Sequence, residues 1–92
     1  LKEQRQRQLG VVAANGVAAT YTGAKCNAWA GGRSGPNYAV QGNILAGEAV
    51  VAGMERAFLD SKGKTLAERL YAAIVAGDRA GGDARGRQSM AL

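Results

Sequence analysis

The stretch Tyr38–Gly47, YAVQGNILAG, decides how this chain folds. Its first part, Tyr38–Leu45, alternates and carries β-formers, which predicts a strand. In such a strand Gln41 and Asn43 place two amides on one side of an otherwise apolar element, with Gly42 between them. A buried amide without partners costs about 1–3 kcal/mol. We therefore expect these amides to bind something specific, and Gly42 to leave room for a backbone or a ligand.

Upstream of this stretch, two β-rich runs flank Asn15-Gly16 and predict a hairpin over Leu9–Thr22. The Asn-Gly dipeptide is typical of a two-residue type I′ turn. The register that follows pairs Ala14 with Val17, Val12 with Ala19 and Gly10 with Tyr21. Both faces of this hairpin are mostly apolar, so we expect both to be covered. That predicts a sheet between other layers, which 92 residues hardly supply.

The segment 23–37, GAKCNAWAGGRSGPN, is expected to be a loop. Trp29 either plugs the edge of the core or stacks on a ligand. Cys26 is the single cysteine, which excludes an intrachain disulfide, and no histidine is present to activate it. The GGRSG run lacks the Gly-Lys-Ser/Thr ending of a phosphate-binding loop, so that interpretation is not favoured.

Downstream, two amphipathic helices are predicted. The first spans Gly47–Lys62, with a core stripe at helical spacing; its members are Val50, Val51, Met54, Ala57 and Phe58. The second spans Thr65–Ala76 and begins with a Thr65/Glu68 capping box. Its expected buried stripe is Leu66, Leu70, Ala73 and Ile74, and Gly77 is expected to end it. The short connection predicts an antiparallel helix pair lying on the sheet.

The segment 77–88, GDRAGGDARGRQ, interleaves charges with four glycines. Its charged residues are Asp78, Arg79, Asp83, Arg85 and Arg87. Arginines on such a loop bind carboxylates in bidentate geometry, and an aspartate holds an arginine or an amine. The alternative is a solvated turn whose charges pair with each other. Gln88–Leu92, QSMAL, alternates again and predicts the start of a further strand.

Composition limits the classes of function. The chain is long enough for one small domain, carries a net charge of +5 and has no histidine, the commonest general base. The basic residues lack interleaved aromatics, so nucleic acid is not an expected partner. No apolar run reaches the roughly 18 residues of a membrane helix. With one cysteine, these features predict a reducing, cytoplasmic location without cofactor or metal. Because the chain begins at Leu1, we expect an internal segment or a processed product.

Several runs together resemble a known family. They are GVAATYTGAKCNAWAG, NYAVQGNILAG, LAERL and GGDARGRQSMAL. They resemble the domain of unknown function 1028 family, which is described as similar to the N-terminal-nucleophile (Ntn) hydrolases. The resemblance covers Leu9–Leu92, and its most specific runs are Val40–Gly47 and Gly81–Ser89.

The resemblance implies an α+β fold that is part of an αββα four-layer sandwich. Residues 9–92 would be an incomplete domain of this kind, after a polar lead-in at residues 1–8. A complementary N-terminal segment or subunit would complete it, and a homo-oligomer is expected. The implied activity is cleavage of an amide bond. Such enzymes use an N-terminal Thr, Ser or Cys, so Leu1 places the nucleophile outside this chain.

The resemblance also suggests site residues. Gly42 and Asn43 are candidates for supporting an oxyanion site. Asp83, Arg85 and Gln88, with Trp29, are candidates for binding a small amide or amino-acid-like ligand. The alternative function is a non-catalytic small-molecule-binding or assembly module of the same fold.

Overall fold

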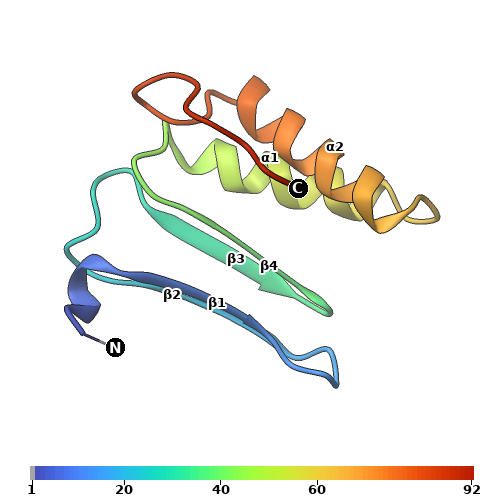
Figure 1. The fold of residues 1–92 in the computed structure, drawn as a ribbon, viewed down its shortest axis with the longest axis horizontal. Helices are drawn as coiled ribbons and strands as arrows, with labels where there is room; N and C mark the ends of the chain where they lie inside the picture. The colour runs from blue at the N-terminus through green and yellow to red at the C-terminus, as the bar shows by residue number, and fades with distance from the viewer. Residues whose placement is uncertain (1) are drawn as a thin grey trace.

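The chain folds into three layers, two small β-sheets stacked face to face and a helix pair above them (Figure 1). The computed structural model describes residues 2–92. After a short 3-10 turn at Gln4–Gln6, the elements are β1 (Gln8–Val12), β2 (Ala18–Thr22), β3 (Gly31–Gly35), β4 (Tyr38–Gly42), α1 (Glu48–Asp60) and α2 (Leu66–Arg79). β1 pairs with β2 and β3 with β4, both antiparallel. The predicted α+β class is confirmed. Of the expected polar lead-in, Leu1 lies outside the described residues and Gln8 already belongs to β1.

The first hairpin forms where the sequence predicts it, but the predicted register is wrong by one residue. The observed partners are Val12 with Ala18, Val11 with Ala19, Gly10 with Thr20 and Leu9 with Tyr21. The loop has three residues rather than two, because the Ala13 N–H donates to the Val17 carbonyl at 2.8 Å. Gly16 follows the turn with a φ of 88°, in the left-handed region. Asn-Gly suits this loop as well as a type I′ turn, so the dipeptide does not distinguish them.

The second hairpin corrects two predictions. β3 lies inside the segment expected to be a loop, and β4 ends at Gly42 instead of Leu45. β3 is the sequence GGRSG, whose glycines give no β signal. Its strand conformation depends on pairing with β4 across the Pro36–Asn37 turn, where Asn37 takes a φ of 71°. β4 ends because Ile44 turns into the left-handed region, with a φ of 57°.

Small residues allow the two sheets to lie close together. β2 packs over β3, and β1 packs over β4. A Cβ added to Gly32 would lie 2.8 Å from the Val40 carbonyl oxygen and 2.9 Å from Thr20 Oγ1. A Cβ added to Gly10 would lie 2.8 Å from Gln41 Oε1. Glycine at these two positions therefore leaves room for side chains of the facing sheet, Thr20 at Gly32 and Gln41 at Gly10.

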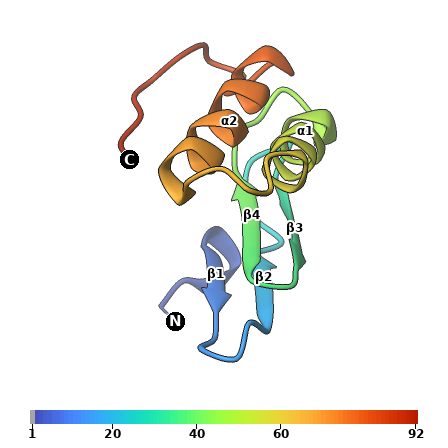
Figure 2. The ribbon, with the colours of Figure 1, turned by 90° about the vertical axis from the view of Figure 1, so that its right-hand side faces the viewer.

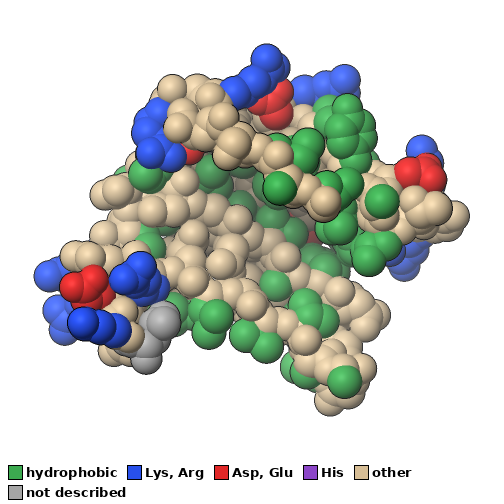
Figure 3. Space-filling model, in the orientation of Figure 1, with side chains coloured by type: hydrophobic (Ala, Val, Ile, Leu, Met, Phe, Trp, Pro, Cys, Tyr) green, Lys and Arg blue, Asp and Glu red, His purple; other side chains and the backbone are tan. Residues whose placement is uncertain are grey.

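The outer face of the β1–β2 sheet is uncovered. Leu9, Val11 and Tyr21 lie on it, and they are 50%, 49% and 42% exposed. In the part of the chain that the structure describes, β3–β4 covers only the inner face, whereas the sequence predicts cover on both. Figure 3 shows hydrophobic side chains along this layer and again around the helices. Contiguous apolar surface of this kind is typical of an interface.

The first helix matches its prediction. Val50 and Val51 of α1 are 2% and 1% exposed, and they form the centre of the small core. Ser61 ends the helix and donates its hydroxyl to the Ala57 carbonyl at 2.9 Å. This bond satisfies one of the carbonyls that a helix end leaves without a partner.

The second helix departs from its prediction in two respects. Thr65 caps it as expected, accepting the Glu68 N–H at 3.2 Å. The helix continues through Gly77 to Arg79. Gly77 is buried in the helix, where its missing side chain leaves space for Met54. The left-handed residue that follows the helix is Gly81, with a φ of 121°. In the expected stripe only Ala73 is buried, whereas Leu66, Leu70 and Ile74 are 65%, 39% and 36% exposed. The physical reason is that α2 packs chiefly on α1, and within residues 2–92 no sheet lies beneath its apolar side.

A polar cluster joins the β3–β4 sheet to α1. Arg33 of β3 pairs with Glu48 at 3.1 Å and with Glu55 at 3.2 Å. The Tyr38 hydroxyl donates to Glu55 Oε2 at 2.6 Å. Hydrogen bonding by Tyr38, and then by Arg33, lowers the pKa of Glu55, and the same carboxylate raises the pKa of Tyr38. These bonds fix the position of the helix layer on the sheet.

We expect Gly53→Ala to raise the free energy of unfolding by about 0.5–1 kcal/mol, because glycine inside a helix costs about that much relative to alanine. A Cβ at Gly53 would meet the Ala76 carbonyl oxygen at 3.6 Å and Ala80 Cβ at 3.7 Å, which is ordinary contact. Urea unfolding measures the change. A lower stability of the variant would mean that α1 and α2 lie closer together than described.

The segment after α2 carries no strand in this structure. Residues 87–92 have no regular secondary structure, and Met90 and Leu92 are 53% and 68% exposed. The strand that the sequence predicts from Gln88 is absent from this conformation, in which Arg87 pairs with Asp78 of α2. Neither helix within residues 2–92 combines the length and the apolar character that crossing a bilayer requires.

Candidate functional site

The two most distinctive runs of the sequence meet just after β4. Leu45 exchanges two backbone hydrogen bonds with Trp29, at 2.9 and 3.2 Å, and forms an antiparallel bridge with Asp83. The Ala84 N–H donates to the Ile44 carbonyl at 2.7 Å on the Asp83 side. Three segments far apart in the sequence are thus held side by side by their backbones. The candidate residues Trp29 and Asp83 lie on opposite sides of Leu45.

Two buried amide oxygens at this place lack a partner. They are Gln41 Oε1 and Asn43 Oδ1, and neither has a hydrogen-bond partner among residues 2–92. Gln41 lies on the side of β4 that faces Gly10 of β1. The sequence predicts that Asn43 lies on the strand, but in the structure β4 ends at Gly42 and Asn43 follows it. An unpartnered buried oxygen costs free energy, so both positions favour an incoming N–H or O–H donor.

Gln8 also belongs to this site, although the sequence predicts only that it is part of a polar lead-in. Its Nε2 donates to the Gly42 carbonyl at 2.8 Å, to Thr22 Oγ1 at 3.0 Å and to the Gly31 carbonyl at 3.4 Å. It therefore ties the β1–β2 sheet to the β3–β4 sheet beside Asn43. A polar residue at the start of an apolar run was the only signal in the sequence.

A groove of about 790 Å³ lies between β4, the helices and the segment after α2. It brings together Gln41, Asp83 and Gln88. The remaining candidates, Trp29, Gly42, Asn43 and Arg85, do not line it. Apolar side chains make up much of the wall, among them Leu45, Val50, Met54, Ile74, Val75 and Met90. Apolar walls with a few polar groups are typical of small-molecule sites.

Charged residues at the end of α2 and in the loop after it form two ion pairs. Arg85 binds Asp83 through two nitrogens, at 2.9 and 2.7 Å, and Arg87 binds Asp78 in the same bidentate way. The Arg85 side chain, followed by its backbone N–H, lowers the pKa of Asp83 to about 2. Arg87 lowers the pKa of Asp78. Both aspartates are therefore ionised at neutral pH and already have a cation as partner.

We expect Asp83→Asn to lower stability slightly at pH 7, and the difference from the unmodified protein to vanish between about pH 4 and pH 2. The pair contributes stability above the ordinary pKa of 3.8, and that contribution is lost as the pH falls through the folded value of about 2. The effect is small because the Arg85 side chain is 57% exposed, so water screens the pair. Urea unfolding at pH 7, 4 and 2 measures it, with Asp60→Asn as the control on α1. A difference that stays constant down to pH 2 would rule out this ion pair.

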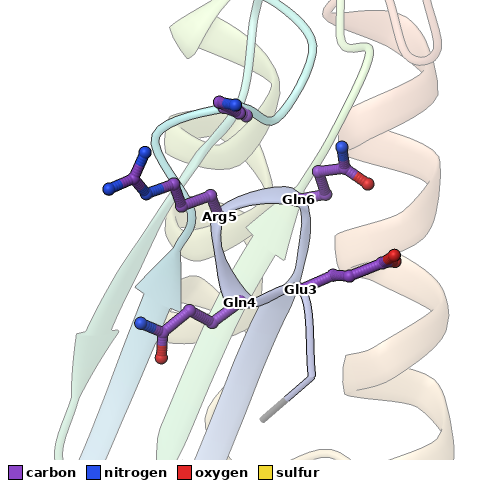
Figure 4. A pocket seen from close by; sticks show the side chains of 5 residues that line it. Glu3, Gln4, Arg5 and Gln6 are labelled. Carbon is purple, nitrogen blue, oxygen red and sulfur yellow. The ribbon is translucent and has the colours of Figure 1, made fainter.

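Other parts of the described chain are weaker candidates for a binding or catalytic site. A hollow of about 540 Å³ is lined by Glu3, Gln4, Arg5, Gln6 and Lys25. Figure 4 shows the side chains of Glu3 and Gln6 on one side of the turn and those of Gln4 and Arg5 on the other, so the four do not converge on one point. Cys26 is partly exposed, and its thiol contacts the Arg7 carbonyl oxygen at 3.5 Å. Within residues 2–92, no three His, Cys, Asp or Glu side chains gather where they could hold a metal ion.

Comparison with known proteins gives two findings. A family model described as "Family of unknown function (DUF1028)" matches residues 2–92. The crystal structure of protein SPO2555 from Silicibacter pomeroyi, assigned to the same family model, is similar with a TM-score of 0.75 and 31% identity. The match covers 80% of this chain and 32% of that one, so this chain spans about a third of its relative. No curated protein matches the sequence.

Proposed function

The chain belongs to the family of unknown function DUF1028, and from this premise we propose that it forms the substrate-holding part of an amide-bond hydrolase. The proposed enzyme is of the Ntn-hydrolase-like class, with its nucleophile outside these 92 residues. Fold similarity alone does not assign a reaction, so the assignment depends on the groups that the site presents.

The layers support the proposed architecture. Two face-to-face sheets with helices on one side are three of the four layers of an αββα sandwich (Figure 2). The uncovered face, with Leu9, Val11 and Tyr21, lies where the fourth layer would pack. We propose that a complementary segment or subunit supplies this layer together with the nucleophile. Burial of three such side chains contributes several kcal/mol, about 1.5–3 for each large one, which is a sufficient driving force.

The observation that carries the function is the pair of unpartnered amide oxygens. Gln41 Oε1 and Asn43 Oδ1 are acceptors, so they favour a ligand that presents N–H groups. An amide or an ammonium group supplies such donors. Leu45, which follows these two amides in the chain, forms a backbone bridge with Asp83, and Asp83 pairs with Arg85. The guanidinium of Arg85 is suited to a ligand carboxylate. An amino-acid-like amide combines both kinds of group.

The proposed reaction needs few groups from this chain. A Thr, Ser or Cys on the complementary part attacks the amide carbonyl and passes its proton to the departing nitrogen, so the C–N bond breaks and an amine leaves. Water then attacks the acyl-enzyme, which releases the acid and returns the proton to the nucleophile. Asn43 and the backbone near Gly42 are the proposed stabilisers of the oxyanion. Gln88 supports substrate binding from the wall of the groove.

Release of free amine tests the proposal. The protein with its complementary part is incubated with a panel of N-acyl amino acids and primary carboxamides, and new amine is detected by fluorescence. Gln41→Leu is expected to reduce the rate about tenfold, the value of one hydrogen bond of about 1.4 kcal/mol, and to leave stability unchanged or higher. Leu70→Ala on the exposed side of α2 is the matched control. Unchanged turnover in Gln41→Leu would exclude this role of the amide oxygens.

The alternative is a non-catalytic binding module of the same fold. One observation favours it: Asp78 and Asp83 already bind arginines, which leaves fewer charged groups free for chemistry. Ligand-dependent thermal stabilisation without release of amine would support binding alone. Turnover by the native protein would reject it.

A further inference from the structure

The side of α2 that faces away from the strands combines apolar residues with opposite charges. A hollow of about 720 Å³ runs along this side, and its lining includes Ala57 of α1 but no residue of β1–β4. Ala72, Val75 and Ala76 line it, together with Tyr71, which is 56% exposed. Figure 2 shows the helix pair at the end of the molecule opposite β1 and β2. An exposed aromatic residue beside small apolar ones is typical of a surface that meets another protein.

Four residues of this hollow follow the spacing by which two helices pack along their length. Glu68, Ala72, Val75 and Arg79 are separated by four, three and four positions in the sequence. This alternation is that of the a and d positions of a helix pair, so the four residues lie in one line along α2. We call this line the α2 seam. It has apolar residues at its centre and one charge at each end.

The α2 seam is complementary to itself when a second copy of the chain is turned end to end. A two-fold axis through the middle of the seam places Ala72 opposite the partner's Val75, and Glu68 opposite the partner's Arg79. The same operation repeats each contact with the roles of the two copies exchanged, because a two-fold interface uses one patch on both subunits. The centre of the contact is therefore apolar, and each end joins a carboxylate to a guanidinium.

The charges at the two ends favour this occupant and this direction. Among residues 2–92, neither Glu68 nor Arg79 forms an ion pair with another side chain. Glu68 accepts a hydrogen bond from the Thr65 hydroxyl through Oε1 at 3.0 Å. A parallel second helix would bring Glu68 beside the partner's Glu68, and like charges in contact oppose association. The antiparallel arrangement avoids this and forms two ion pairs instead.

The hollow beside the α2 seam provides space for an aromatic ring. The two-fold operation that joins the seams also places the partner's Tyr71 opposite Ala76. Ala76 lines the hollow together with Ala57 and Ala80, and alanines leave room that a larger side chain would fill. Tyrosine suits such a position, because its ring buries a large area while its hydroxyl stays in contact with water at the rim.

We infer that the outer side of α2 is the interface of an antiparallel two-fold dimer, in which the α2 seams of two copies pack together. The ion pairs join Glu68 to the partner's Arg79 at both ends. This inference is independent of the proposed reaction, since it concerns only one helix face. It is also compatible with a layer on the outer face of the β1–β2 sheet, which lies at the opposite end of the molecule (Figure 2).

Sedimentation velocity of the native protein over a series of concentrations tests the inference. The unmodified protein is expected to be a dimer that dissociates on dilution. Arg79→Glu and Glu68→Lys each bring like charges together at both ends, and each is expected to raise the dissociation constant about tenfold or more. Lys62→Glu, in the exposed connection between the helices, changes the net charge as much as Arg79→Glu does and should leave the constant unchanged.

A mixture of the two variants separates loss of the ion pairs from loss of folding. In a dimer of one Arg79→Glu chain and one Glu68→Lys chain, both ends again join opposite charges. The mixture should therefore associate about as tightly as the unmodified protein. Two variants that dissociate alone but recover together cannot be misfolded.

Three results would overturn the inference. A native protein that is monomeric at every concentration would mean that this side of α2 is left to water or to a different protein. A dimer whose dissociation constant changes in neither single variant would place the interface elsewhere. Failure of the mixture to recover would mean that Glu68 and the partner's Arg79 do not meet.

Discussion

Gly32→Val is expected to lower the free energy of unfolding by about 2–3 kcal/mol, the usual cost of overpacking. The position is in β3, where a valine by itself would favour the strand by up to about 1 kcal/mol. The contacts reverse that preference. A Cβ there would lie 2.8 Å from the Val40 carbonyl oxygen, 2.9 Å from Thr20 Oγ1 and 3.1 Å from Thr20 Cβ. The Val40 oxygen belongs to the backbone of the paired strand β4 and Thr20 is a stiff side chain of the facing sheet, so neither moves aside easily.

Urea unfolding with Ser34→Val as the control measures this effect. Ser34 is on the same face of β3 two residues away, and it is exposed. We expect the control variant to be as stable as the unmodified protein, or slightly more stable. Equal stability of Gly32→Val and Ser34→Val would contradict the close approach of the two sheets.

A valine at Gly77 is also expected to cost about 2–3 kcal/mol, because it overpacks the contact between α1 and α2. A Cβ at this position would lie 2.8 Å from Met54 Cγ and 2.9 Å from Met54 Sδ, with Val50 Cγ1 at 3.6 Å. Removing glycine from a helix normally stabilises it by about 1 kcal/mol, so here too the contacts must reverse the intrinsic preference.

The double variant Gly77→Val/Met54→Ala distinguishes this contact from a general intolerance of the site. Shortening Met54 removes the atoms that the new side chain would strike, so the double variant should be more stable than the sum of the two single changes predicts. Thermal unfolding of the four proteins of the cycle provides the coupling. Strict additivity would mean that Gly77 is not packed against Met54.

The parts of the fold that the sequence predicts are those with strong local signals. The Thr65 cap, the Val50–Val51 core and the first hairpin each combine spacing with a turn or cap residue. The hairpin register is ambiguous because Asn15-Gly16 suits two loop lengths. β3 gives no signal, because GGRSG becomes a strand only through its pairing with β4 and its packing under β2.

Glycine also explains the error at the end of α2. A glycine at position 77 is compatible with the end of a helix or with a close contact between two helices. The contact with Met54 on the neighbouring helix shows that the second applies, and the sequence does not reveal that contact. The exposed side of α2 could not be anticipated either. Its leucines are spaced for burial, but the surface that would bury them is absent from the described residues.

The sequence predicts the amide groups of the candidate site better than it predicts the arrangement of the charged groups. The sequence identifies Gln41 as a buried amide because it stands on an apolar strand, and its oxygen is indeed buried without a partner. The contact between the Val40–Gly47 and Gly81–Ser89 runs depends on the path of two intervening helices, which no local pattern specifies. The roles of Trp29, Gly42, Asn43, Asp83, Arg85 and Gln88 stay predictions.

Cysteine labelling of the β1–β2 outer face tests most directly the proposal that this chain is one side of a layered sandwich. Val11→Cys in a Cys26→Ser background is compared with Lys62→Cys, which lies in the exposed connection between the helices. In the native protein with its complementary part, the thiol at position 11 should react with a water-soluble maleimide about a hundredfold more slowly than that at position 62, as buried groups that react only on local opening do. Equal rates would contradict the account, because the apolar face would then be in contact with water.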